Sequence, residues 1–306
     1  MSAQWVAGNV RARALLNRRL GVGRTRDLAA MNSLTDFQHA LAATAYGRDI
    51  TVGQPAQDTD HAVCAALLWH LRVLAGWQPA SGAQAIRALA AGFEANNIAV
   101  HARQLAGSPA RPPYMLGALA TAWPRLSETR SLAQLREILA QTMWGDPGSE
   151  SPSDIALAVQ VGWAARVASA VPEARSWADA WSALTVARQR LMERRELPEP
   201  VLMRTRLVLG TAATASDLAS FTNAFPTRLA WLFDGITEAD GLWTAEARWW
   251  ARVEADGLAM LGHSEFTRAR TIGAVAVLAA DAWRCRAALA MASRGGGPMD
   301  VYDVVA

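Results

Sequence analysis

The chain has 306 residues, of which 52% are hydrophobic and 19% are charged, and this composition excludes a largely disordered protein. All 30 of its basic residues are arginines and the formal net charge is only +3, which disfavours a strongly basic, nucleic-acid-binding class of protein. Its two cysteines, Cys64 and Cys285, lie in apolar segments, so we expect buried free thiols in a reducing compartment.

The N-terminal part of the chain predicts two short helices. Residues 9–20 place apolar side chains at helical spacing between arginines, and Gly21 and Gly23 are expected to end this helix. Residues 25–31 predict the second helix. No apolar core follows the first arginines, so no signal peptide is expected, and no apolar run reaches the ~20 residues of a membrane-spanning helix. These features predict a cytoplasmic protein, or one attached to a membrane through a partner.

A fifteen-residue segment occurs twice. Residues 33–47 read SLTDFQHALAATAYG, and residues 131–145 read SLAQLREILAQTMWG. Each copy predicts a short helix with a serine N-cap, Ser33 or Ser131, and a closing glycine in a left-handed C-cap conformation, Gly47 or Gly145. One such helix cannot bury its apolar face alone, so the repeat predicts a stacked or pseudo-symmetric helical protein.

The segments after the two copies also repeat, in the order polar loop, apolar helix, second helix. The expected helices cover residues 62–77 and a segment ending at 107 after the first copy, and 155–170 and a segment ending at 197 after the second.

A third, weaker copy is expected over residues 216–235. Helices over residues 242–261 and 271–293 are expected to follow it. The proline-bearing segments 108–113 and 196–200 interrupt the helical pattern and mark joints between domains. We therefore predict an all-α protein with three similar pseudo-symmetric helical domains. Their expected bounds are residues 1–107, 108–199 and 200–306.

The sequence lacks the common catalytic motifs. There is no GxxxxGK[ST] loop, no GxSxG elbow and no HExxH pair, and the absence of lysine excludes a lysine-dependent P-loop or Schiff-base enzyme. Glu94 is notable by its position before two asparagines, but no second acid lies near it to form an acid–base pair. His70 is interpreted as a core histidine. We expect no enzyme activity, no catalytic residue, no cofactor and no metal site.

The 13 tryptophans are interpreted mainly as fillers of cores and helix–helix seams. In the adjacent pair Trp249–Trp250, one ring is expected to remain available to a partner.

These residues resemble a known family. The order of a short helix, L-x-x-T-x-Y-G, a polar loop, an apolar helix and acid-x-x-N-I-x-x-x-x-R is similar to the V/A-type ATPase C-subunit family, known in eukaryotes as the d-subunit family. The final helix is similar to the closing E-x-x-N-L-R helix of that family, although Arg284 stands where the family has asparagine. The matching residues are LAATAYG (41–47), Glu94, Asn97, Ile98, Arg103 and DAWRCR (281–286). The resemblance covers essentially the whole chain and accounts for the repeat, because that family has three similar helical domains.

The resemblance implies a divergent member of this family: a funnel-like, non-catalytic adaptor at the centre of a rotary ATPase. Such an adaptor sits on the cytoplasmic face of the membrane ring and receives the central stalk. It transmits torque between ATP turnover and ion movement, as in proton transport or ATP synthesis. Its partners would be the ring and stalk subunits, with membrane contact only through the ring and no nucleic acid.

Exposed arginines of the first and last helices are expected to contribute to docking. The predicted partner contacts are Arg11, Arg18, Arg19, Trp249, Arg284 and Arg286.

Three alternatives remain open. The first is an all-helical protein-interaction scaffold unrelated to a rotary motor, which would share the fold. A nucleic-acid binder would show a basic face and steep salt dependence, and a small-molecule enzyme would show polar residues converging in an apolar cleft.

Overall fold

The computed structural model describes residues 3–262, 265–297, 299 and 302–303. These residues form helices and no strand, so the predicted all-α class is confirmed. The chain divides into two compact units: Met1–Ile86 with Trp250–Ala306, and Arg87–Trp249. The first unit therefore combines both ends of the chain, which a division into consecutive segments does not anticipate. The three expected domains and the funnel-like body stay a prediction.

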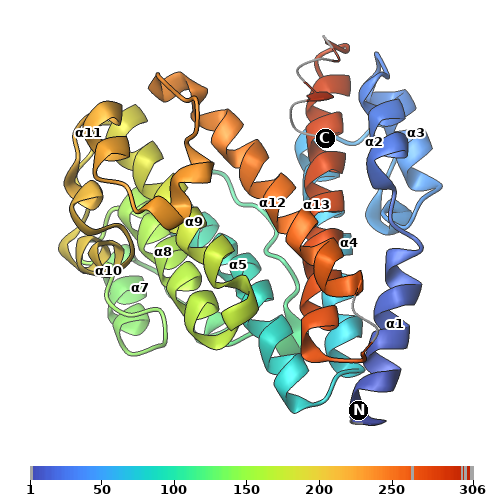
Figure 1. Ribbon diagram of the computed structural model, residues 1–306, viewed down its shortest axis with the longest axis horizontal. Coiled ribbons are helices and arrows are strands. Elements are labelled where there is room, and N and C mark those ends of the chain that lie inside the picture. Colours follow the sequence, from blue (N-terminus) through green and yellow to red (C-terminus); the bar gives the residue numbers. More distant parts are fainter. Residues whose placement is uncertain (1–2, 263–264, 298, 300–301, 304–306) are drawn as a thin grey trace. The chain divides into compact units, whose positions relative to one another are not determined.

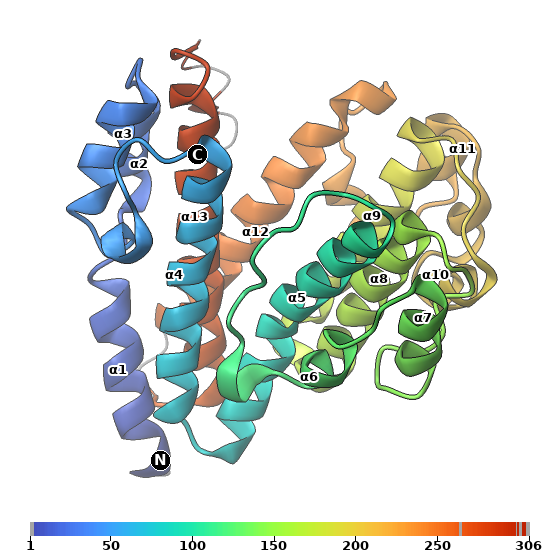
Figure 2. The ribbon, with the colours of Figure 1, turned by 180° about the vertical axis from the view of Figure 1, so that it is seen from behind.

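The first unit is built around α13 (Arg268–Ala292), which is buried on most of its surface and lies beside α1, α2 and α4 in both views (Figures 1 and 2). A helix that is apolar nearly all round needs neighbours on every side. Glycine permits a close approach between α13 and α12 (Leu242–Gly262), because a Cβ atom on Gly273 would lie 2.6 Å from the carbonyl oxygen of Gly257. The other helices of this unit are α1 (Val6–Leu16), α2 (Gly21–Ala29), α3 (Leu34–Ala42), α4 (Ala56–Gly76), the start of α5 (Ala80–Leu105) and the later part of α12 (Leu242–Gly262).

The second unit has α8 (Pro152–Ala170) packed along α9 (Arg175–Ala187), with α10 (Glu199–Leu209) against both (Figure 2). Three tryptophan rings pack in a row in this unit, of which Trp249 is buried and Trp163 and Trp181 are half-buried. The ring centroids of Trp163 and Trp181 are 6.2 Å apart, and those of Trp181 and Trp249 are 4.9 Å apart. The remaining helices are the rest of α5, α6 (Trp123–Leu126), α7 (Leu132–Ala140), α10 (Glu199–Leu209), α11 (Leu218–Asn223) and the start of α12.

Three short helices share one N-terminal arrangement. Ser33 before α3, Ser131 before α7 and Asp217 before α11 each accept a hydrogen bond from the backbone N–H three positions later, at 3.3, 3.2 and 2.8 Å. The two predicted serine caps are confirmed. The third helix is capped by Asp217, one residue after the expected start, because its carboxylate accepts the bond.

The same three helices bury the same position. Four residues after each cap stand Phe37, Leu135 and Phe221, all fully buried. The apolar face of each of these three short helices is therefore buried.

The closing glycines differ from the prediction. Each short helix ends several residues earlier, at Ala42 and Ala140, and only Gly145 has a left-handed backbone, with φ of +75°. Gly47 is required for a different reason, because a Cβ atom there would lie 2.0 Å from the carbonyl oxygen of Ala42. Close approach of the chain to the end of α3 thus excludes a side chain at this position.

Both predicted joints lack continuous helix. After α5 the chain has no helical turn until the 3₁₀ segment Gly117–Leu119. After α9 a π-helical turn, Arg188–Met192, leads into a loop, and α10 begins at Glu199 with Pro200 in its first turn. Proline is tolerated there because the first N–H groups of a helix have no intrahelical partner.

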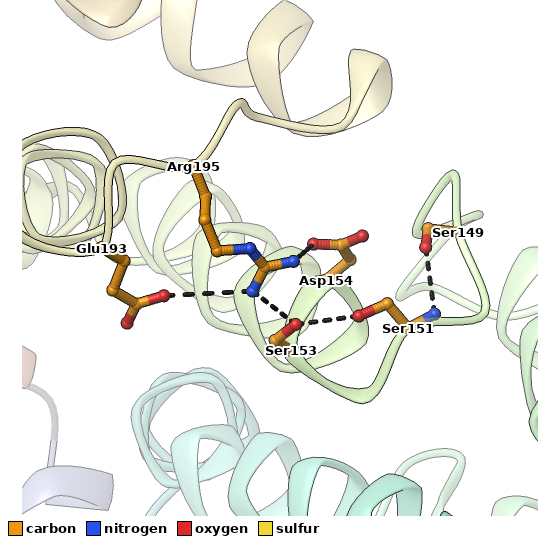
Figure 3. A network of polar contacts seen from close by, with 6 residues as sticks. All are labelled: Ser149, Ser151, Ser153, Asp154, Glu193 and Arg195. Atoms are coloured by element: carbon orange, nitrogen blue, oxygen red, sulfur yellow. Dashed lines mark hydrogen bonds and ion pairs between the residues drawn. The ribbon is translucent and has the colours of Figure 1, made fainter. Parts of the chain in front are cut away.

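Arg195 ties this loop to the start of α8 (Figure 3). Its guanidinium donates to the Ser153 hydroxyl at 2.5 Å and to the Asp154 carboxylate at 2.9 Å, and Glu193 lies 4.0 Å away. The Ser153 hydroxyl lies 2.8 Å from that of Ser151. Arg195 therefore holds two segments of the second unit together.

Replacing Gly47 with alanine is expected to destabilise the first unit by about 2 kcal/mol or more, because the added methyl group overlaps the Ala42 carbonyl. Chemical denaturation of the two proteins measures this difference. Gly23→Ala is the control, since a Cβ atom there meets nothing within 4 Å and alanine favours the helix by up to about 1 kcal/mol. Equal stabilities of G47A and G23A would contradict the close approach.

Candidate functional site

Glu94 of α5 lies at the centre of a buried polar cluster. Its carboxylate, 0% exposed, accepts the backbone N–H groups of Thr121, Ala122 and Trp123 at 2.7, 2.6 and 2.8 Å. It also accepts the Thr121 hydroxyl at 2.8 Å and the indole N–H of Trp144 at 3.4 Å. These donors saturate a group that has about four lone-pair sites. Glu94 therefore fixes the start of α6 and the end of the second repeated segment.

Asn97, one turn further along α5, holds the segment after this helix. Its amide donates to the carbonyl oxygen of Tyr114 at 2.9 Å and accepts the N–H of Tyr114 at 2.8 Å. Ile98 is fully buried, and Arg103 is exposed. Three of the four α5 residues that carry the resemblance thus have structural roles.

Asp281 of α13 repeats the arrangement in the first unit. Its carboxylate, 0% exposed, accepts the N–H groups of Leu20 and Gly21 at 3.0 and 2.7 Å and the Tyr46 hydroxyl at 2.9 Å. Burial, followed by the Asp281 charge, raises the pKa of Tyr46 well above its ordinary value. Tyr46 and Trp144, which occupy matching positions in the two segments, therefore each donate to a buried acid.

This contact corrects one sequence prediction. Gly21 and Gly23 do not end the first helix, which stops at Leu16, but belong to the first turn of α2. Gly21 has a φ of +73°, which glycine adopts readily, and its N–H meets Asp281. A cap supplied from 260 residues away has no local signal in the sequence.

A third buried acid was not predicted from the sequence. Asp179 of α9 stands in the tetrapeptide ADAW, which recurs around Asp281, and it forms an ion pair with Arg228 at 3.2 Å. Three positions after each of the three acids comes a buried polar residue: Asn97, Ser182 or Arg284. The repeated tetrapeptide was the signal that could have found this position.

A pocket of about 410 Å³ opens in the first unit, beside the turn that follows α3. Its polar and aromatic lining consists of Arg18, Thr44, Arg48, Trp69 and His70. None of the described residues that line it carries a carboxylate. The Arg48 guanidinium lies over the Trp69 ring, 5.1 Å from its centroid.

His70 forms the buried wall of this pocket and is 5% exposed, as expected for a core histidine. Burial, followed by the charges of Arg18 and Arg11, lowers the pKa of His70 from 6.5 to about 4. Its imidazole is therefore neutral near pH 7.

The predicted partner contacts have different surroundings. Arg18 and Arg19 are exposed, Arg11 is half-buried, and Arg286 is exposed but paired with Asp60 at 2.6 Å. A docking role for these four arginines stays a prediction.

Trp249 and Arg284, the other two predicted partner contacts, are buried. Trp249 is 6% exposed, and its indole N–H donates to the carbonyl oxygen of Trp177 at 2.7 Å. Arg284 is 3% exposed and ion-paired with Glu254. The neighbouring ring of Trp250 stacks on Trp283, with centroids 5.6 Å apart. Trp249 is therefore part of the core, whereas Trp250 is half-buried against Trp283.

Comparison with models of known protein families gives no match, and no curated protein sequence is significantly similar to this chain. Within the described ranges, no helix combines the length and the apolar character needed to cross a bilayer. The same residues contain no group of three or more histidine, cysteine or acidic side chains that could hold a metal ion.

Glu94→Gln is expected to lower the free energy of unfolding by about 2–4 kcal/mol, because an amide replaces a charged acceptor and turns a donor toward backbone N–H groups. Denaturant titration measures the loss. Glu128→Gln, which changes an exposed acid in the same unit, should be nearly neutral. A neutral E94Q would show that the carboxylate does not fix the start of α6.

The neutral state of His70 predicts a pH dependence. Because the pKa of His70 in the folded chain lies below its ordinary 6.5, the stability it contributes is present above pH 6.5 and is lost as pH falls toward 4. The full loss amounts to about 3 kcal/mol. Stability curves of the wild type and His70→Gln should therefore converge between pH 6.5 and 4. Parallel curves over this range would contradict a buried neutral imidazole.

Proposed function

We propose that this protein is the non-catalytic central adaptor subunit of a V/A-type rotary ATPase, coupling the central stalk to the membrane ring. One observation carries the proposal. In both units, an acid on a long helix holds the start of a short helix and the aromatic residue that closes the following repeated segment. Glu94, Asp281 and Tyr46 are among the residues on which the resemblance to the V/A-type ATPase C-subunit family rests, and Trp144 is the counterpart of Tyr46 in the internal repeat.

Close-packed helices that buried carboxylates link to neighbouring segments are suited to transmitting torque. Close-packed helices resist deformation, and a carboxylate that holds backbone N–H groups of a neighbouring segment opposes sliding of one helix along another. Glu94 and Asp281 provide this link between segments 27 and 261 residues apart. The role needs shape and many modest contacts and does not need a catalytic group.

The proposed location is the cytoplasmic face of the membrane, with membrane contact only through the ring. Ring and stalk subunits are the proposed partners. The exposed side chains of Arg18 and Arg19 would meet polar or acidic loops of these subunits.

Co-purification tests the proposal. The tagged chain would be recovered from gently solubilised native membranes, and its partners identified by mass. Recovery of a ring subunit together with stalk and nucleotide-binding subunits is the expected result. A chain recovered with other proteins but with no ATPase subunit would favour the interaction scaffold, which shares the fold.

Replacing Arg18 and Arg19 together with glutamine is expected to weaken co-purification of the ATPase subunits about tenfold at low salt, because surface charges steer and hold partners. The difference should shrink as salt screens these charges. The control replaces Arg175 and Arg206, two exposed arginines of the second unit, and should retain assembly. Unchanged recovery of the complex by the Arg18/Arg19 variant would remove these residues from the docking surface.

A further inference from the structure

The pocket of the first unit has a counterpart in the second. Helices α4 and α8 each follow one copy of the repeated segment, and they begin at Ala56 and Pro152. Ten positions beyond these starts stand Ala66 and Gly162, and fourteen positions beyond them stand His70 and Arg166. The pocket wall formed by Ala66 and His70 therefore corresponds to the surface of α8 near Arg166.

In the second unit this corner is filled by the side chain of Arg204 from α10. Its Nη2 donates to the carbonyl oxygen of Trp144 at 3.4 Å, and a Cβ atom on Gly145 would lie 2.5 Å from the same nitrogen. A Cβ atom on Gly162 would lie 3.8 Å from Nη1 of Arg204. The guanidinium thus occupies the space next to both glycines.

In the first unit the corner is open. The space of about 410 Å³ is lined by Gly47 and Ala66, which match Gly145 and Gly162, together with Arg18, Arg48 and His70. No hydrogen bond of the His70 side chain occurs among the described residues, although it is 5% exposed. The His70 ring nitrogens are not among the buried polar atoms without a partner in the described residues, so they are accessible from the pocket to water or to a ligand.

The positive charge of the pocket favours an anionic ligand. Arg18 makes no ion pair with a described residue, and the exposed carboxylate of Asp49 lies 3.9 Å from Arg48. The two guanidinium groups supply donors and positive charge, of which the charge of Arg48 is partly offset by its exposed ion pair with Asp49, and the imidazole N–H adds a neutral donor. The pocket is therefore an electropositive recess with donors and without a competing carboxylate in its lining.

We propose that this pocket binds a phosphate group through Arg18, Arg48 and His70. A phosphate carries about −1.5 to −2 charges near neutral pH, which matches two guanidinium groups better than the single charge of a carboxylate. Guanidinium groups also fit phosphate oxygens in pairs. The site does not depend on the proposed rotary function.

Isothermal titration calorimetry of the full chain with inorganic phosphate, at low ionic strength and pH 7.5, tests the site. We expect one binding event per chain. Arg18→Gln and Arg48→Gln should each weaken it about tenfold or more, because each removes a charge-assisted hydrogen bond. Arg13→Gln, which removes an exposed charge from the same unit outside the pocket lining, should bind like the wild type.

One further probe, glycerol phosphate, identifies the source of the phosphate. Tighter binding of glycerol phosphate than of inorganic phosphate would show that the pocket takes a phosphate monoester, and weaker binding would show that it takes the free ion. Either result supports the site.

Acetate distinguishes phosphate from the acidic side chain of a protein partner. Acetate binding as tight as phosphate binding would overturn the proposal in favour of a carboxylate. No phosphate binding, or equal weakening by R13Q and R18Q, would overturn it outright. These measurements use the isolated chain, so their failure is separate from a failure of co-purification with ATPase subunits.

Discussion

A buried carboxylate that holds the start of a helix is the interaction on which this structure depends. Removing a carboxylate from water costs several kcal/mol unless charge-assisted hydrogen bonds replace its hydration. Glu94 recovers this cost from three backbone N–H groups, a hydroxyl and an indole. These hydrogen bonds hold α6 in place, because a helix of only four residues could not form on its own. Asp281 does the same for α2, and the positive end of each helix dipole adds to the attraction.

Local patterns predicted much of the helical structure. Serine caps at Ser33 and Ser131 and the prolines that interrupt helices act within a few residues, so the sequence displays them directly. Contacts between distant residues were not predictable in this way. The start of α2 depends on Asp281, and the need for glycine at position 47 depends on how the chain passes the end of α3. The burial of Trp249 and Arg284 likewise follows from partners far along the chain, which helical spacing alone does not identify.

The candidate site consists of buried acids, whose hydrogen bonds are made within the chain, and of a basic pocket that is open to a ligand. The buried acids have their donors within the chain, so the residues that carry the family resemblance account for folding more directly than for contact with partners. The open part is the basic pocket, where Arg18 and Arg48 face a space that Arg204 fills in the corresponding corner of the second unit. The two copies of the repeat thus share the contacts of a buried acid, and they differ in the corner that Arg204 fills in the second unit and that is open in the first. The rotary adaptor proposal rests on the buried acids and their donors, and the phosphate proposal rests on the basic pocket.

Electron cryo-microscopy of the ATP-driven complex purified from native membranes with a tag on a nucleotide-binding subunit tests the adaptor proposal most directly. We expect helical density for this chain on the rotation axis, between the cytoplasmic end of the ring and the central stalk. A complete rotary complex whose axial position is occupied by a different protein, with this chain absent, would contradict the proposal.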